Sequence, residues 1–348
     1  MTTSSIDLKA RRTALAAAEP QLRARDVATK LGISEAELVA LGNDTAVPTR
    51  LRPEWPAIIA AVPTLGRVMA LTRNEACVHE RKGTYGKLGG GAHVGLIVGE
   101  DIDLRIFFTE WRFGFAITEE TKQGPRRSLQ FFDAQGVAIH KIYLTDGSDV
   151  AAFEALVANW AVEASPVVTE AKKERAAPLA DGAVDVAAFQ SAWDALKDTH
   201  AFHGLLNKFK LQRQQALRLA GERRAHSVEK SALRDILTSA AQRGTPIMVF
   251  VGNPGMIQIH TGPVKELKAM GPWFNVLDDS FNLHLREDMI VSAWVVWKPT
   301  EDGVVTSVEL FDANGELIAS LFGKRKPGQP EDEAWRMLVA SLLTKEAA

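Results

Sequence analysis

Two histidines, His200 and His203, stand three residues apart in a stretch rich in apolar and basic side chains. Residues three apart share one face of a helix, so both imidazoles can point toward one partner. Their apolar neighbours are Phe202, Leu205, Leu206 and Phe209, and the cations that follow are Lys208, Lys210 and Arg213. This combination suits a flat, apolar anion that carries a metal. Haem is such a ligand, because its iron takes an axial imidazole and its propionates pair with arginine or lysine.

The same spacing also occurs on ordinary helix surfaces, and spacing alone leaves that interpretation open. A further set of cations, Arg105, Lys298 and Arg325, lies within or next to apolar segments expected to be strands. Each can be a strand-edge cation whose stem packs on apolar neighbours while its charge reaches water. The alternative is that they form an anion pocket between two parts of the chain.

Composition limits the class of protein. The chain has 348 residues, a formal charge of −2 and one cysteine, Cys77. The length allows two domains, and the near-neutral charge gives no general attraction to nucleic acid or membranes. A lone cysteine excludes an intramolecular disulfide and a thiolate-built metal cage. We see no signal peptide and no apolar stretch of membrane-spanning length, so we expect a cytoplasmic protein.

The two halves of the chain match each other in one register. The matched segments include residues 31–41 with 209–219, 103–105 with 284–286, and 132–136 with 311–315. The offset changes only from 178, for Phe209 against Leu31, to 181, for Arg286 against Arg105. Several independent matches at a nearly constant offset indicate a tandem duplication.

Each repeat opens with helices and continues with short β-branched and aromatic segments separated by turn residues. We expect strands at residues 68–72, 93–98, 104–109, 113–118, 128–133 and 137–143, and again at 247–252, 257–260, 274–277, 283–286, 290–298, 304–311 and 317–323. Closing helices are expected at 150–162 and 331–343. Successive strands without intervening helices predict a largely antiparallel sheet and an α+β fold. We expect repeats at 1–163 and 184–348, joined by a solvated linker at 164–183.

The duplication singles out the histidine pair. At the helix offset of 178, His200 and His203 fall opposite Leu22 and Arg25, so the first repeat lacks the pair and the fold does not require it. This difference between the repeats favours a functional role. His79 and His260 occupy matching strand positions, which favours a structural role instead. No zinc motif, paired cysteine motif or nucleotide-binding motif is present.

Several segments carry a resemblance to a known family. They include Pro-Ile-Met-Val-Phe-Val-Gly-Asn at 246–253, Gly-Pro-Trp-Phe-Asn-Val-Leu-Asp at 271–278, Phe-Asn-Leu-His-Leu-Arg at 281–286 and His-Glu-Arg-Lys-Gly at 79–83. Over nearly its whole length the sequence resembles the HemS/HmuS/ChuS-type hemin-degrading factors. The resemblance implies a cytoplasmic protein of a bacterial haem-uptake system. It also implies two repeats, with haem b (iron protoporphyrin IX) held in a cleft between helices and sheet.

The resemblance also implies roles for individual residues. His200 matches the proximal iron ligand, and Arg105 matches the distal residue, so these two are the expected catalytic positions if the chain degrades haem. The other expected haem contacts are Phe107, Arg213, Lys298, Phe322 and Arg325. His203 stands where some members have Phe and others His, which makes it an alternative ligand. Phe322 replaces a tyrosine of some members, which removes one hydroxyl from the site.

Two functions follow as expectations. In the first, the protein receives haem from an inner-membrane ABC importer. It then passes the haem to a haem oxygenase, or opens the porphyrin oxidatively with an external electron donor. The sequence leaves open whether it is an enzyme and whether it is a monomer or a homodimer. The second is a haem-responsive DNA-binding regulator that uses a helix-turn-helix-like segment at 25–42, where Ser34 and Glu37 form a capping box. The absence of basic residues from 35–41 counts against this second function.

Overall fold

The computed structural model describes residues 5–172, 177–325 and 328–344. The chain forms two compact units. Unit 1 comprises Met1–Arg73, Glu80–Lys173 and Asn253–Gln258, and unit 2 comprises Asn74–His79, Glu174–Gly252 and Ile259–Ala348. Each unit therefore contains one short segment from the other half of the chain. Strands β3 (Cys77–Thr84) and β12 (Met256–Gly262) carry the chain from one unit into the other.

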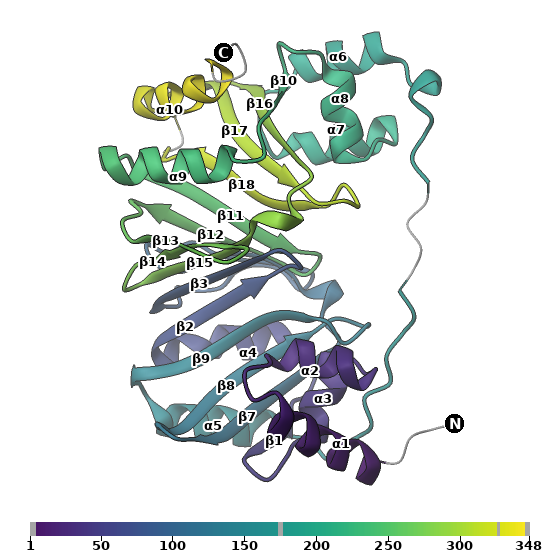
Figure 1. The fold of residues 1–348 in the computed structure, drawn as a ribbon, viewed down its shortest axis with the longest axis vertical. Coiled ribbons are helices and arrows are strands. Elements are labelled where there is room, and N and C mark those ends of the chain that lie inside the picture. The colour runs from purple at the N-terminus through teal and green to yellow at the C-terminus, as the bar shows by residue number, and fades with distance from the viewer. Residues whose placement is uncertain (1–4, 173–176, 326–327, 345–348) are drawn as a thin grey trace. The chain divides into compact units, whose positions relative to one another are not determined.

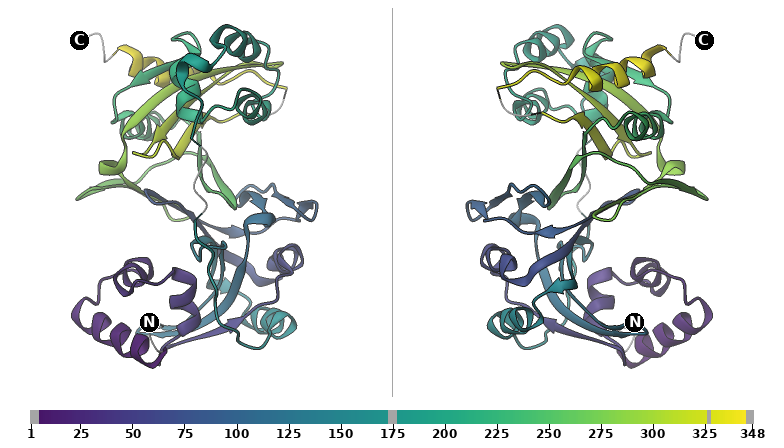
Figure 2. Two further views of the ribbon diagram at one scale, coloured as in Figure 1. Left: turned by 90° about the vertical axis from the view of Figure 1, so that its right-hand side faces the viewer. Right: turned by 90° about the vertical axis from the view of Figure 1, so that its left-hand side faces the viewer.

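Unit 1 is built on an antiparallel sheet with helices on both faces (Figures 1 and 2). The strand order is β1 (Ala46–Arg50), β7 (Phe113–Thr121), β8 (Gly124–Phe132), β9 (Ala138–Ser148) and β2 (Gly66–Arg73). A second antiparallel group contains β4 (Gly89–Gly90), β5 (Val94–Ile97) and β6 (Asp103–Phe107). The helices are α1 (Ser5–Ala18), α2 (Ala24–Leu31), α3 (Glu35–Leu41), α4 (Trp55–Ala61) and α5 (Val150–Trp160), with short turns η1 (Val62–Leu65) and η2 (Phe108–Glu110).

The side-chain period of two places different cores on the two faces of this sheet. On β7, Phe113, Phe115 and Ile117 pack with Ala36 of α3. The intervening Ala116 faces the opposite core, which includes residues of α4 and α5. Both faces of β7 are therefore buried, and the strand reads as an almost continuous apolar run.

Unit 2 repeats the same plan. Its strand order is β10 (Ala225–Val228), β16 (Ser292–Thr300), β17 (Gly303–Phe311), β18 (Leu317–Gly323) and β11 (Ile247–Asn253), with a second group of β13 (Leu267–Met270), β14 (Trp273–Leu277) and β15 (Phe281–Arg286). Helices α6 (Val186–Asp194), α7 (Ala201–Phe209) and α8 (Arg213–Ala220) share a core with one face of the sheet, and α9 (Ala232–Arg243) and α10 (Glu333–Thr344) share a core with the other. The short turns are η3 (Asp181–Ala183) and η4 (Glu287–Met289).

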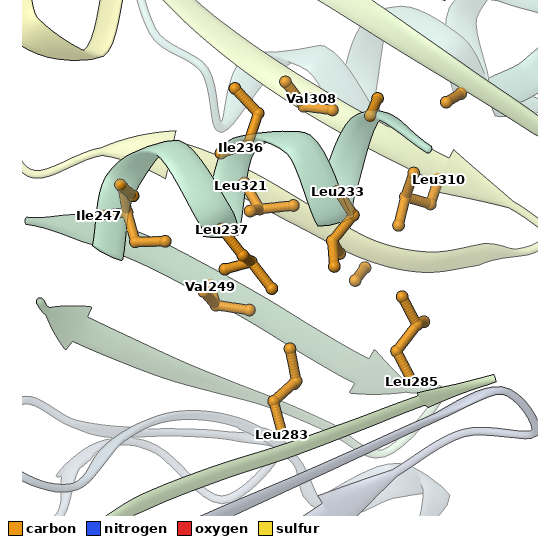
Figure 3. Close-up of a cluster of buried hydrophobic side chains, with 14 of the residues drawn as sticks. Leu233, Ile236, Leu237, Ile247, Val249, Leu283, Leu285, Val308, Leu310 and Leu321 are labelled. Carbon is orange, nitrogen blue, oxygen red and sulfur yellow. The ribbon is translucent and has the colours of Figure 1, made fainter. Parts of the chain in front are cut away.

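Helix α9 illustrates how the core of unit 2 is assembled (Figure 3). Leu233, Ile236 and Leu237 follow helical spacing and belong to one buried cluster with Ile247 and Val249 of β11. All five side chains are fully buried. Each such burial contributes about 1.5–3 kcal/mol relative to an exposed side chain, so this contact fixes α9 on the sheet.

The α+β class and the tandem duplication are confirmed. The two sheets share one strand order, in which β1-β7-β8-β9-β2 corresponds to β10-β16-β17-β18-β11. The expected capping box is present: Ser34 Oγ accepts from the Glu37 N–H at 3.2 Å, and Glu37 Oε2 accepts from the Ser34 N–H at 2.8 Å. Gly136, in the turn between β8 and β9, has a left-handed backbone with φ of 76°. None of the described helices is long and apolar enough to cross a membrane.

Some elements were not among those expected from the sequence. Edge strand β1 contains Pro48, which an edge tolerates because the missing N–H is not needed in a ladder there. Strand β13 is an exposed edge strand, so it lacks the apolar pattern of a buried strand. Strand β10, with only four residues, is too short to show a clear period.

Candidate functional site

His200 lies immediately before the first residue of α7, and its side chain is 86% exposed. Asp198 Oδ1 accepts from the backbone N–H of His200 at 2.9 Å and lies 2.7 Å from His200 Nδ1. These hydrogen bonds from His200 lower the pKa of Asp198, which keeps the carboxylate ionised. An ionised carboxylate can only accept hydrogen bonds, so Nδ1 of His200 carries the proton that it donates to Asp198. The Nε2 lone pair then faces away from Asp198. Carboxylates orient metal-binding imidazoles in this way.

His203 lies in the first turn of α7 and is exposed, like His200. Phe202, between them, is buried. Because the histidines are three residues apart at the start of one helix, the structure presents both imidazoles on the outer side of α7. That both imidazoles serve one ligand stays a prediction.

A buried cluster of charges lies beneath α7. Glu309 of β17 is fully buried and accepts from Arg213 Nε at 2.7 Å, from Arg213 Nη2 at 2.8 Å and from Lys298 Nζ at 2.8 Å. Ser307 Oγ donates to the same carboxylate at 3.0 Å. We name Arg213, Lys298 and Glu309 the ionic triad. It carries two cations and one carboxylate, and therefore one net positive charge.

The pKa shifts in the ionic triad reflect a balance between burial and pairing. Burial alone would raise the pKa of Glu309, but the two cations outweigh it and hold that pKa far below its ordinary value. For Lys298, burial lowers the pKa, and the attraction of Glu309 only partly offsets it. For Arg213, Glu309 outweighs burial, and the pKa rises. Glu309 thus opposes the effect of burial on both cations.

The ionic triad supports the aromatic side chain that anchors α7. Lys298 Nζ lies 4.6 Å from the centre of the Phe202 ring, and Arg213 Cζ lies 5.2 Å from it. Trp193 of α6 packs edge-on against the same ring at 4.8 Å. Lys298 is 3% exposed, whereas the Arg213 side chain keeps 30% of its surface exposed. Arg213 therefore reaches solvent, and Lys298 acts from beneath the helix.

The remaining expected residues of unit 2 lie at the end of β18. Phe322 is half-buried and packs on Phe250, with ring centres 4.9 Å apart. Arg325 lies 4.0 Å from Asp302 and also contributes to lowering the pKa of Asp198. That electrostatic link places Arg325 within the electrostatic surroundings of the Asp198–His200 pair.

Arg105 and Phe107 lie on one face of β6 in unit 1, and both are half-buried. Arg105 forms an ion pair with Asp103 on the same face of β6. On the neighbouring strand, Leu96 is opposite Arg105 and Val94 is opposite Phe107. Val94 is 52% exposed and Val98, just beyond the strand, 66%. This face of β5 and β6 therefore combines exposed apolar side chains with one arginine–aspartate ion pair.

The structure adds residues that the sequence reasoning missed. They are Asp198, Glu309 and the exposed apolar side chains of β5, namely Val94, Leu96 and Val98. The alternation at 94–98 was a readable signal for a strand with one open apolar face. Asp198 could also be found, because a carboxylate two residues before a histidine can reach its imidazole. Glu309 could not, since its partners are distant in sequence.

The described residues contain no group of three or more His, Cys, Asp or Glu side chains able to hold a bare metal ion. One exposed imidazole with an orienting carboxylate supplies a single ligand. Such a site suits a metal whose other positions are already filled by an organic ring. The net positive charge of the ionic triad, in the same unit as His200, suits the acidic groups of such a ligand.

Comparison with known proteins identifies the family. The sequence matches the family described as "Haemin-degrading HemS.ChuX domain" twice, over residues 32–160 and 210–342. These matches cover most of both repeats. The chain therefore belongs to the HemS/HmuS/ChuS family of haem-utilisation proteins.

Individual relatives are similar along their full length. The chain is 42% identical over 338 residues to the hemin transport protein HmuS of Yersinia pestis, covering 95% of this chain and 96% of the relative. Its structure resembles holo-PhuS, a heme-binding protein from Pseudomonas aeruginosa, with a TM-score of 0.95, 51% identity and coverage of 98% and 99%. It also resembles the heme-degrading enzyme ChuS of Escherichia coli O157:H7, with a TM-score of 0.91, 40% identity and coverage of 97% and 99%.

Proposed function

We propose that this chain binds haem b with His200 as the axial iron ligand. The observation that carries the proposal is the pair formed by Asp198 and His200, in which Nδ1 is held by a carboxylate and Nε2 is left open. A histidine that binds no metal does not require an orienting carboxylate on an exposed turn. The proposal also draws on the relatives HmuS, named a hemin transport protein, and PhuS, named a heme-binding protein.

The other residues of the site would each serve a different part of the ligand. The apolar porphyrin would lie against aromatic and aliphatic surface that includes Phe107 and Phe322. The propionates would pair with Arg213 and Arg325, while buried Lys298 adds positive charge. Arg105 would lie on the distal side, and His203 would serve as an alternative ligand during transfer. When bound, haem supplies an iron that accepts one imidazole and leaves a second position for reaction or exchange.

The biological role that fits best is haem utilisation in the bacterial cytoplasm. The protein would receive imported haem from an inner-membrane ABC importer. It would then deliver the haem to a haem oxygenase, or take part in its degradation with Arg105 and His200 as the catalytic residues. The similarity to ChuS, named a heme-degrading enzyme, favours keeping degradation in the proposal. The DNA-binding alternative gains no support, because α3 has no basic side chain for DNA. Its two acidic side chains serve the fold of unit 1: Glu35 pairs with Lys141, and Glu37 completes the cap of Ser34.

A haem titration of the purified apo-protein tests the ligand assignment. The wild-type chain should give a saturable Soret band with the spectrum of imidazole-ligated iron. His200→Ala should lose that spectrum or shift to a weaker, His203-dependent one, and His200→Ala/His203→Ala should lose it entirely. His226→Ala, away from α7 on β10, is the matched control and should behave as the wild type does. A His200→Ala variant with an unaltered band and affinity would disprove the assignment.

A second experiment separates a carrier from an enzyme. The haem complex is incubated in air with ascorbate or a reductase and NADPH, in the presence of catalase. Decay of the Soret band to an open-chain tetrapyrrole would indicate degradation by the protein. A complex that stays intact under catalase and transfers its haem to an added haem oxygenase would indicate a carrier.

A further inference from the structure

A cavity of about 320 Å³ lies on the outer side of unit 1, away from the strands that carry Arg105. Its lining includes Arg50, Pro53, Arg112, Phe113, Pro166 and Val168. The volume is at the lower end of the range for small-molecule sites. Two arginines and a mostly apolar remainder are an unusual lining for a surface depression with no function.

Among the described residues, no acidic side chain forms an ion pair with either guanidinium group of this cavity. Arg50 lies between the rings of Phe113 and Phe115, with its Cζ 4.9 Å from the centre of each. Its Nη1 is buried, and within the described part of the chain it has no hydrogen-bond partner. Burial, followed by repulsion from Arg112, lowers the pKa of Arg50. Because Nη1 is closed off, a ligand in the cavity would meet the exposed remainder of this half-buried guanidinium, together with Arg112.

The segment that follows α5 forms one wall of the cavity and is held on unit 1 by backbone hydrogen bonds. The Val162 N–H donates to Arg50 O at 3.0 Å, and the Glu170 N–H donates to Ala134 O at 2.8 Å. Pro166 and Val168 lie between these two attachments, and Val168 is 75% exposed. These two hydrogen bonds hold the wall in place, and the surface that it exposes is apolar.

The fold does not require these arginines. Strand pairing makes Ser292 the counterpart of Phe113, since each is paired with the last residue of the following strand, Phe311 or Phe132. Arg112 then corresponds to Val291 in unit 2. By the same pairing, Arg50 corresponds to Ser227, because their partners Phe115 and Trp294 occupy equivalent positions. Unit 2 builds the same sheet with neither cation.

We propose that this cavity binds a small organic anion, with its carboxylate between Arg50 and Arg112 and its apolar body against Pro53, Pro166 and Val168. A carboxylate supplies the acceptors that both guanidinium groups lack. The apolar wall favours an anion with a hydrocarbon body over a bare inorganic ion. The site is independent of the haem ligand proposed above, because none of the haem-site residues lines it.

The test uses the full-length apo-protein with two probes, benzoate and inorganic phosphate. Binding is followed by NMR of the arginine Nε–Hε signals and by calorimetry. Benzoate should shift the Arg50 and Arg112 signals saturably and bind at least tenfold more tightly than phosphate. Equal affinity for the two probes would overturn the assignment of an apolar body, and no saturable shift with either would overturn the site.

Variants then locate the binding. Arg112 is exposed, so Arg112→Gln should fold normally and weaken benzoate binding at least tenfold. Val168→Asp places a negative charge at the rim, outside the core, and should weaken it similarly. Arg67→Gln, an exposed arginine on β2 outside the cavity, is the matched control and should leave the affinity unchanged. Equal benzoate affinity in the wild type, Arg112→Gln and Val168→Asp would disprove the proposal.

Discussion

The two units join an equivalent helix to an equivalent sheet through buried ion pairs of opposite polarity. In unit 1, Glu35 at the start of α3 pairs with Lys141 on β9. In unit 2, the position equivalent to Glu35 is Arg213 at the start of α8, and it pairs with Glu309 on β17. All but Arg213 are buried. The acid is on the helix in one unit and on the sheet in the other.

This reversal leaves the units with different net charges at the same place. The Glu35–Lys141 pair is neutral, whereas Lys298 gives the ionic triad an excess positive charge beneath Phe202. The excess lies under the helix that carries His200 and His203, and unit 1 has no histidine on α2 or α3. The duplication thus kept an ionic link between helix and sheet but made one copy suitable for an anionic ligand.

A second difference concerns buried neutral polar groups. In unit 1, His140 is fully buried, with Nε2 2.6 Å from Tyr85 Oη and Nδ1 2.9 Å from Thr72 Oγ1. Thr72 Oγ1 donates to Gln258 Oε1 at 2.8 Å, so it accepts from Nδ1–H, and Tyr85 therefore donates to Nε2. The equivalent of His140 in unit 2 is Ala319. At this position unit 1 therefore has a buried imidazole that must stay neutral, whereas the equivalent side chain of unit 2 cannot titrate.

The largest expected effect is a loss of stability around His140 in acid. Burial lowers the pKa of His140 from 6.5 to about 3. Because the folded pKa is depressed, the unfolded chain binds a proton first. Above pH 6.5 the neutral, buried His140 contributes its full stabilisation of about 4–5 kcal/mol. This stabilisation is lost as the pH falls from 6.5 toward 3. Hydrogen exchange, corrected for intrinsic rates, should show β2 and β9 losing protection across this range before β11 and β18 do.

His140→Gln is the control for the acid experiment, since glutamine can hydrogen-bond but does not titrate. In that variant the extra acid sensitivity of β2 and β9 should disappear, even if stability at neutral pH is lower. Parallel loss of protection in both units of the wild type would show that His140 does not set the difference.

The next largest effect comes from breaking the ionic triad. Glu309→Gln leaves Arg213 and Lys298 facing each other without an acid, and we expect a loss of about 4 kcal/mol in the free energy of unfolding. Glu35→Gln leaves only Lys141 without its partner and should cost about 3 kcal/mol. Both figures lie within the range for breaking buried ion pairs. Urea unfolding measures both.

A double variant sharpens this comparison. Adding Lys298→Met to Glu309→Gln removes one of the two opposed cations, so it should restore part of the lost stability. If the double variant is as unstable as the sum of the two single changes, the cations do not interact as the triad requires.

A smaller effect is expected at the orienting carboxylate. Asp198→Asn no longer assigns the proton to His200 Nδ1, so haem should bind about tenfold more weakly, at the low end of the effect of outer hydrogen-bond partners on metal sites. In the apo-protein, imidazole ¹⁵N shifts should change from one tautomer to a mixture, a readout that needs no haem. An unchanged tautomer together with unchanged haem affinity would remove Asp198 from the site.

Local patterns made much of the fold predictable, and long-range pairing limited what could be known of the site. The duplication, the Ser34 capping box and most strands follow from residues close together in the sequence. The partners of Glu309 are 11 and 96 residues away, and the strand register that brings them together depends on the whole sheet. The placement of Arg105 and Phe107 on an open apolar face likewise needed the pairing of β5 with β6. The relation of that face to His200 stays a prediction.

The smallest expected effect concerns the helices that carry the reversed charges. Helix α3 has the Ser34 capping box, whereas Gln212, the residue before α8, has extended dihedral angles and makes no side-chain cap. Ser34→Ala should therefore cost about 1 kcal/mol, and Gln212→Ser should gain about 0.5–1 kcal/mol because serine can accept from the Gln215 N–H. Thermal unfolding measures both changes, with Gln212→Ala as the control for losing the glutamine. A Gln212→Ser variant no more stable than Gln212→Ala would mean that the start of α8 is fixed by the Arg213–Glu309 pair alone, and that the ionic link in unit 2 has taken over the role that the cap has in unit 1.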